Sequence, residues 1–170
     1  MKIVIASIFS FFFLYNKATA QDSSKLSVSG YIDVYYQFDF DKPQNHQRSF
    51  FLYNHKRHNE VNVNLAFAKV NYLANKVRAN LAVMTGNYPQ YNLAAEPQIL
   101  QHIYEANIGI ELSKKNKIWL DAGIMPSHIG FESAVSADCY TLSRGLLAEN
   151  SPYFETGIKL TKTNKKKMFL

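Results

Sequence analysis

Four consecutive residues, His55-Lys56-Arg57-His58, have side chains that could bind a metal ion or a nucleic acid. The remaining histidines are scattered, and none of the five forms the H-E-x-x-H spacing of a zinc site. In an extended chain, residues three apart lie on opposite faces, which separates His55 from His58. We therefore expect no metal ion and no other cofactor. We also expect no nucleic acid, because most lysines lie in short polar breaks rather than in one basic patch.

Catalysis would need a nucleophile beside a base. Ser127 and His128 are the best candidates for a hydrolase, but they are adjacent in the chain and so poorly placed to hydrogen-bond to each other. No G-x-S-x-G motif and no phosphate-binding loop accompanies them. We therefore expect the protein not to be an enzyme.

Charged side chains also gather in one long segment without periodicity, residues 126–152. If this segment folds into a channel, its charged residues would set the local electric field at a constriction. The alternative is an ordinary surface loop with a helical turn at residues 141–148. The candidates for a constriction are Glu132, Asp138, Arg144 and Glu149.

The start of the chain predicts a secretory signal peptide at residues 1–20. A basic start, Met1-Lys2, is followed by an apolar run at 3–15 and by Ala18-Thr19-Ala20, which suits signal peptidase. The apolar run is shorter than the roughly 20 residues that a membrane-spanning helix needs. We expect residues 21–170 to form one domain.

The alternation of apolar and polar residues is the strongest pattern in the chain. From 26 to 40, every even residue is apolar, aromatic or glycine, and every odd residue is polar or tyrosine. Because side chains alternate between the faces of a strand, this pattern predicts a strand with one apolar face. The same alternation predicts five more strands at 60–68, 77–85, 103–112, 118–124 and 154–161, and the start of a seventh at Met168-Phe169-Leu170.

The connections between these strands alternate in length. Short lysine-rich breaks follow the second, fourth and sixth strands, whereas the long connections at 41–58, 86–101 and 126–152 follow the others. Short turns at one end and long loops at the other are typical of a transmembrane β-barrel. The predicted fold class is therefore all-β, an antiparallel meander of a transmembrane β-barrel.

The composition of the two faces indicates which of them meets water. The polar face is rich in asparagine, small residues and tyrosine, and poor in the lysine and glutamate that cover a soluble surface. We therefore expect the apolar face, including Val61, Val63, Leu65 and Phe67, to meet lipid, with Phe38, Phe40, Tyr104 and Phe154 as an aromatic girdle. The expected pore-lining residues are Asp33, Gln37, Asn62, Asn64, Arg78, Asn80, Glu105, Asn107 and Asp121.

Several longer stretches resemble a known family. "FLYNHKRHNEVNVNLAFA", "VRANLAVMTGNYPQYNLAAEP", "DAGIMPSHIGFES" and "AENSPYFETG" are similar to the N-terminal part of the outer-membrane porins with an OmpL-like β-barrel. The resemblance covers residues 29–161. It implies an outer-membrane location and a diffusion pore, and it brings no catalytic residues.

The expected function is therefore that of a porin: a water-filled channel for passive diffusion of small hydrophilic solutes, in contact with outer-membrane lipid. Whether it forms a homo-oligomer stays open. The alternatives are a barrel-based outer-membrane hydrolase and a soluble lipocalin-like barrel that encloses a ligand. Six strands and the start of a seventh are fewer than the roughly 8 of the smallest single-chain barrels, so we expect residues 21–170 to be the N-terminal part of a larger barrel. The basic run at 55–58 would then stand at the pore rim.

Overall fold

The computed structural model describes residues 25–142 and 144–163 of the 170-residue chain. The predicted signal peptide at 1–20 and the predicted start of a seventh strand at 168–170 lie outside the described residues. Within them, the chain forms six strands, two short α-helices and two 3-10 turns. The strands are β1 (Lys25–Tyr36), β2 (Val61–Leu73), β3 (Val77–Thr85), β4 (Ile103–Ser113), β5 (Ile118–Pro126) and β6 (Phe154–Lys162).

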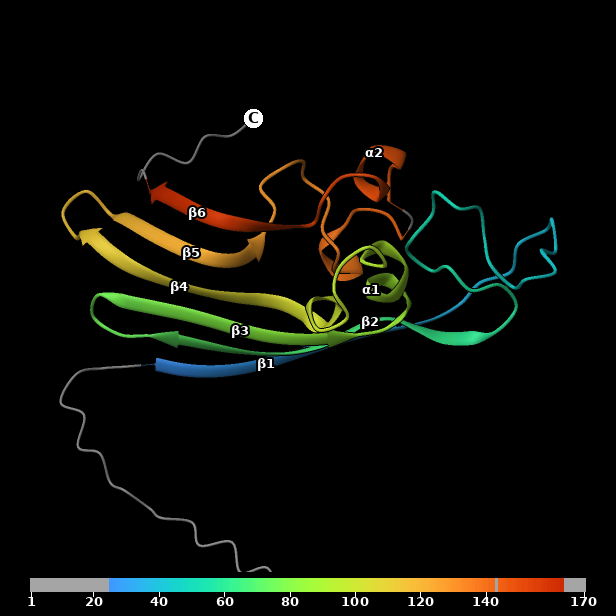
Figure 1. Ribbon diagram of the computed structural model, residues 1–170, viewed down its shortest axis with the longest axis horizontal. Coiled ribbons are helices and arrows are strands. Elements are labelled where there is room, and N and C mark those ends of the chain that lie inside the picture. The colour runs from blue at the N-terminus through green and yellow to red at the C-terminus, as the bar shows by residue number, and fades with distance from the viewer. Residues whose placement is uncertain (1–24, 143, 164–170) are drawn as a thin grey trace, which may run out of the picture.

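The six strands form one open antiparallel sheet in which each strand pairs with the next along the chain. This order confirms the predicted fold class, an all-β meander of an incomplete barrel. In Figure 1 the sheet curls, so that β6 lies above β1, β2 and β3, and the short turns after β2 and β4 lie at the end opposite the long loops. We call these two ends the turn end and the loop end.

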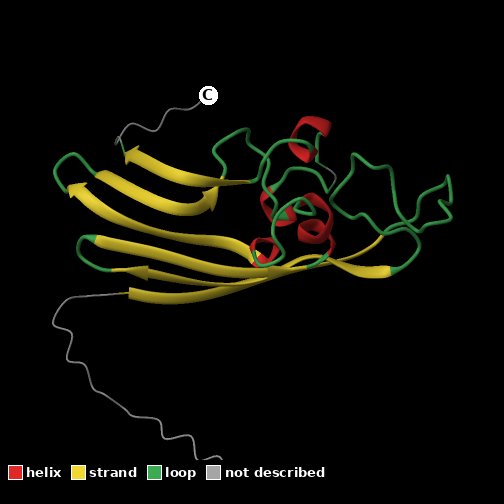
Figure 2. Cartoon of the chain, viewed as in Figure 1, coloured by secondary structure: helices red, strands yellow, loops and turns green. Residues whose placement is uncertain are grey.

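The helical segments all lie at the loop end, as Figure 2 shows in red. Helix α1 (Asn87–Asn92) and the turn η1 (Leu100–His102) belong to the loop between β3 and β4, whereas η2 (Ser136–Asp138) and α2 (Leu146–Glu149) belong to the loop between β5 and β6. The helical turn expected at 141–148 therefore starts later, at Leu146. No helix of the described residues is long and apolar enough to cross a membrane.

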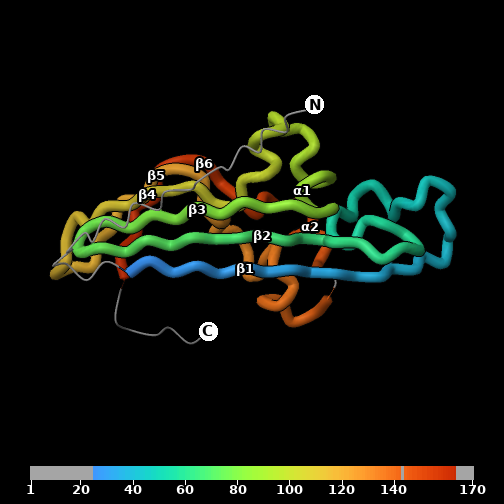
Figure 3. Tube along the Cα trace, turned by 90° about the horizontal axis from the view of Figure 1, so that it is seen from below, coloured from blue at the N-terminus to red at the C-terminus, as the bar shows by residue number. Residues whose placement is uncertain are grey.

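Strand β1 ends four residues before the predicted limit because its partner strand stops. The register between β1 and β2 ends at the pair Tyr36 and Val61. Just before this pair, Asn59 has a φ of 57°, a left-handed conformation that no strand can contain. The alternation at 37–40 therefore continues into a loop, residues 37–60, which extends beyond the strand ends (Figure 3).

Three β-bulges interrupt the register of the sheet. One skips Leu112 between β4 and β5, and the other two, at the loop end, change which face some side chains occupy. The register skips Asn64 between β1 and β2, and it skips Tyr104 between β3 and β4. One extra residue in a strand shifts all later side chains to the other face. The prediction that Leu65 and Phe67 meet lipid is therefore wrong: Leu65 is fully buried, and Phe67 is half-buried against the inner cluster.

The predicted aromatic girdle is wrong in part, and for Tyr104 the reason is again a bulge. Tyr104 is buried and its ring stacks on Phe67 at 4.4 Å between centroids. Phe154 packs against Tyr104, with 5.2 Å between ring centroids. Only Phe40, which is 90% exposed, and Phe38 remain at the surface.

Away from the bulges, the apolar and polar faces of the sheet are exchanged relative to those of a soluble barrel. Large exposed apolar side chains point outward from five of the six strands, all except β5, with Val28 at 72%, Ile32 at 70% and Ile158 at 77% exposure. Buried polar side chains, including Asn64, Glu105 and Asp121, lie on the opposite, inner face. A soluble antiparallel barrel would have its apolar face inside.

The apolar cluster inside the curl lies at the loop end. It joins Leu65, Met84 and Tyr104 from the strands with Tyr88 of α1 and Tyr153, which precedes β6. Gly86 allows α1 to approach so closely, because a Cβ atom at this position would overlap the backbone of Asn64, and its φ of 130° disfavours other residues. The aromatic cluster therefore anchors the long loops to the inner face of the sheet.

Candidate functional site

The inner face carries a paired charge at its turn end. Arg78 of β3 donates two hydrogen bonds to Asp121 of β5, at 2.6 Å from Nε and 2.5 Å from Nη2. The guanidinium also lies 4.5 Å from the ring centroid of Trp119, a cation–π contact. Gly109 of β4 lies between the two strands, and a Cβ atom there would overlap the Asp121 carboxylate. The ion pair therefore spans β4 at Gly109, the one glycine of that strand, where the absence of a side chain leaves room for the Asp121 carboxylate.

A second layer of polar contacts lies next to this pair. Asn80 of β3 donates to the amide oxygen of Asn107 of β4 at 2.8 Å, and Asn107 donates to the carbonyl of Ile124 at 2.9 Å. Lys69 of β2 forms an ion pair with the buried carboxylate of Glu105 at 2.7 Å. These contacts on the inner face thus join amides to one another and opposite charges to one another.

A third group of contacts surrounds Asp33 of β1 near the loop end. Its Oδ2 atom accepts hydrogen bonds from Asn64 of β2 at 2.9 Å and from the hydroxyl of Ser136 at 2.6 Å. The Nε2 atom of His55 lies 3.4 Å away, close enough for an ion pair but not aligned for a hydrogen bond. The backbone N–H of Ser136 also donates to the hydroxyl of Tyr31, at 3.1 Å. The loop between β5 and β6 is therefore attached to β1, at the opposite edge of the sheet.

The structure places the nine predicted pore-lining residues on this inner face or at its rim. Asn64, Glu105 and Asp121 are buried and the others are half-buried. Direct contacts join six of them in three pairs: Arg78 with Asp121, Asn80 with Asn107, and Asp33 with Asn64. Asn62 hydrogen-bonds to Glu60, and Gln37 lies beyond the end of β1.

The basic run at 55–58 lies at the loop end, where the rim of the predicted pore would be, but three of its four side chains are packed into the protein. His55, Lys56 and His58 are each about 95% buried (5%, 4% and 4% exposed). Lys56 donates to the carbonyl of Ser49 at 2.8 Å, and Arg57 pairs with Glu60. Burial lowers the pKa of Lys56, and the nearby Arg48 lowers it further.

His55 is the least satisfied of these side chains. Burial lowers its pKa below the ordinary value of 6.5, the Asp33 carboxylate opposes this effect, and Arg144 adds to it. Its backbone N–H donates to Asn64 at 2.9 Å, and its ring contacts that of Tyr35 edge-on, with 4.9 Å between centroids. The neutral ring thus sits where three segments meet: the loop 37–60, the sheet and the loop 127–153.

The predicted constriction residues have structural partners in the loop 127–153. Arg144 is buried and donates to the carbonyls of Ser133 at 2.9 Å and Ala134 at 2.8 Å, so it holds its own loop together. Glu149 is buried and accepts from the backbone N–H groups of Tyr53 at 2.8 Å and Asn54 at 3.2 Å, which ties this loop to the loop 37–60. Glu132 accepts from the N–H of Gly145 at 3.1 Å, and Asp138 is exposed. The loop is internally braced and crosses the inside of the curl.

Comparison with known proteins agrees with this geometry. The family model described as "Putative beta-barrel porin-2, OmpL-like" matches residues 25–170. The chain belongs to this porin family. Neither a curated protein nor a solved structure matches the chain.

The hydrolase candidates of this porin-family chain do not form a triad-like pair. Ser127 donates to Oε1 of Glu155 at 2.9 Å, and the Nδ1 atom of His128 lies 3.0 Å from Oε2 of the same carboxylate. In a catalytic triad the serine hydroxyl would donate to the histidine. Among the described residues, no group of three or more His, Cys, Asp and Glu side chains is placed to hold a metal ion.

Sequence reasoning missed the residues that bring the porin's loops together. Ser136, Asn54 and Tyr31 make contacts with residues far away in the sequence. Ser136 and Asp33 are separated by 103 residues, and Asn54 and Glu149 by 95. Their types are common in loops and strands, so the sequence offers no signal for them. Only Asn64, in the unusual polar positions of "VNVN", carried a signal.

The buried neutral His55 predicts acid-sensitive loop packing. Because its pKa is lowered in the packed state, the opened loop takes up a proton first as the pH falls below about 6.5, and acid therefore favours opening. We expect backbone hydrogen exchange at residues 53–58, corrected for intrinsic rates, to be faster at about pH 5 than at about pH 7.5, and His55→Gln to remove much of this difference.

The matched control is His128→Gln, at a side chain that is 80% exposed and should leave the pH dependence unchanged. Equal pH dependence in wild type and His55→Gln would show that another group controls the packing of these loops.

Proposed function

We propose that the protein is an outer-membrane channel through which small hydrophilic solutes diffuse passively. The observation that carries this proposal is the reversal of the two faces: apolar side chains point outward along the strands, and polar side chains point inward. A lipid-facing exterior and a water-filled interior require this reversal. The family to which the chain belongs is in accord with the proposal.

The lining of the proposed channel would consist of the predicted pore-lining residues on the inner face of the sheet. Arg78 with Asp121 and Lys69 with Glu105 are opposite charges in direct contact, so their fields largely cancel a short distance away. Asn80 and Asn107 offer neutral donors and acceptors. Such a lining fits uncharged polar solutes and small ions with weak selectivity.

The loop 127–153 would narrow the channel. It leaves the sheet at β5, crosses the inside of the curl and bonds to Asp33 and Tyr31 of β1. In this proposal Arg144 stabilises the conformation of the loop rather than contacting the solute, since its guanidinium donates hydrogen bonds to backbone carbonyls of the same loop. Asp138, which is exposed, is the constriction candidate most accessible to a solute.

The proposed location is the outer membrane, reached by export through the signal peptide expected at residues 1–20. The proposed partners are the surrounding outer-membrane lipid and the diffusing solutes. Oligomerisation through the outer face is compatible with this location but is not needed for the proposal.

Conductance tests the proposed channel. Folded protein added to a planar bilayer should produce stepwise increases in conductance. Asn80 and Leu81 are neighbours on β3 with opposite orientations, since Leu81 is 55% exposed on the outer face. Asn80→Arg should shift ion selectivity towards anions, whereas Leu81→Arg should reduce insertion, by about 2–4 kcal/mol near the bilayer midplane, without changing selectivity.

Folded wild-type protein that enters the bilayer without conducting would refute the channel. The same selectivity shift in both variants would refute the assignment of the two faces.

The proposal that the loop 127–153 narrows the channel is tested by a substitution that loosens this loop. Arg144→Glu places a carboxylate against the carbonyls of Ser133 and Ala134, so the loop should leave its position and the single-channel conductance should rise. Asp138→Asn removes an exposed charge from the same loop and should leave conductance nearly unchanged, with a small change in ion selectivity at most. Unchanged conductance in folded Arg144→Glu protein would remove this loop from the channel.

A further inference from the structure

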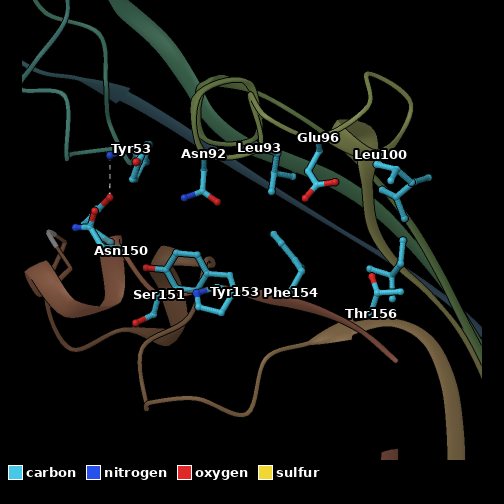
Figure 4. Close-up of a pocket in the computed structure, with 14 residues that line it drawn as sticks. Tyr53, Asn92, Leu93, Glu96, Leu100, Asn150, Ser151, Tyr153, Phe154 and Thr156 are labelled. Atoms are coloured by element: carbon cyan, nitrogen blue, oxygen red, sulfur yellow. Dashed lines mark hydrogen bonds between the residues drawn. The ribbon is translucent and has the colours of Figure 1, made fainter. Parts of the chain in front are cut away.

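A cavity that is partly open to solvent lies at the loop end of the sheet, lined by three loops and by residues of β4, β5 and β6. Its volume is about 360 Å³, and it lies between the segment 92–100, the segment 149–154 and Tyr53 of the first loop. Figure 4 shows Glu96 and Leu100 pointing into it from one side, and Phe154 and Thr156 from the other. Small-molecule sites typically have volumes of roughly 300–1,000 Å³, so the cavity suits a small ligand.

The cavity wall combines polar groups with apolar and aromatic side chains. Leu93 and Leu100 line it on the side of the β3–β4 loop, and Tyr153 and Phe154 on the side of β6. Phe154 is held in place by its contact with Tyr104, and Tyr153 by the ring of Tyr88 at 5.5 Å between centroids. These rings are fixed by the buried cluster, so a ligand would meet a preformed aromatic wall.

The charge of the cavity is negative. Its lining, all within the described part of the chain, includes two carboxylates, Glu96 and Glu149, and no lysine, arginine or histidine. Glu149 is fully used, since it accepts from Tyr53 and Asn54. The carboxylate of Glu96, an exposed residue, makes no hydrogen bond or ion pair with the described residues. Its backbone carbonyl accepts from Gln101, and its backbone N–H donates to the carbonyl of Leu93.

We infer that this cavity binds a small organic cation, an ammonium group on a short apolar body. A free carboxylate opposite an aromatic ring is the arrangement that favours such a cation, through direct charge attraction and the cation–π effect. The same carboxylate repels anions. This inference goes beyond diffusion of solutes and does not need the pore to conduct.

Titration calorimetry with choline as the probe tests the inference on folded protein in a non-ionic detergent. We expect saturable binding of choline, and binding at least tenfold weaker for 3,3-dimethylbutan-1-ol, which has the same shape without the charge. Glu96→Gln should weaken choline binding about tenfold, as expected for one charged contact of about 1.4 kcal/mol. Phe154→Leu should also weaken it, because the ring face is lost.

The matched control is Asp41→Asn, which removes an exposed carboxylate from another loop and should leave choline affinity unchanged. Equal affinity for the neutral analogue, or an unchanged affinity in Glu96→Gln, would overturn the inference. Because choline binding is measured on folded protein in detergent, a negative result there would refute the cation site alone. A negative conductance result in a bilayer would refute the channel alone.

Discussion

Side chains alternate between the two faces of a β-strand, and the whole structure depends on keeping that alternation in one phase across six strands. A residue at one position can face lipid only if its neighbours face inward. The strands keep this phase over most of their length, so that Ile32 and Leu81 point outward while Asp33 and Asn80 point inward. The short turn after β2 preserves this phase from β2 to β3, whereas the register between β4 and β5 skips Leu112 beside the second short turn.

Two of the three bulges change this phase where the long loops meet the sheet. Skipping Asn64 turns Leu65 and Phe67 inward, and skipping Tyr104 turns that ring inward beside them. The result is an apolar cluster on an otherwise polar inner face. It provides the surface on which Tyr88 and Tyr153 pack, and so the loops that carry them are fixed to the wall. The bulges thus determine where the channel of the proposal would be narrowed.

The alternation of apolar and polar residues was sufficient to predict the strands from the sequence, because wherever it occurs it indicates a strand with one apolar and one polar face. It predicted all six of them, their order and the contrast between short turns and long loops. It could not predict the bulges, since skipping Asn64 depends on the partner strand rather than on local pattern. Leu65 and Tyr104 were therefore assigned to the wrong face.

The loops were beyond sequence reasoning for a different reason. The sequence places the run at 55–58 at a pore rim, yet three of its four side chains are buried, because Asn64 and Asp33 of the sheet and Glu149 of the loop 127–153 pack against this segment. The cavity beside Glu96 depends in the same way on three loops meeting. Residue types indicate which chemistry is available, whereas the partners of each group are set by tertiary packing.

The reversal of faces is tested most directly by the accessibility of spin labels along β2 in lipid bilayers. Cys139, the single cysteine of the chain, would first be replaced by serine, and single cysteines then introduced from 61 to 70. Labels at 61, 63, 66, 68 and 70 should collide with oxygen dissolved in the lipid, those at 62 and 64 should favour a water-soluble nickel complex, and those at 65 and 67 should be shielded from both. An alternation with nickel access at 61 and 63, or one that continues without a change of phase at 64, would contradict this account.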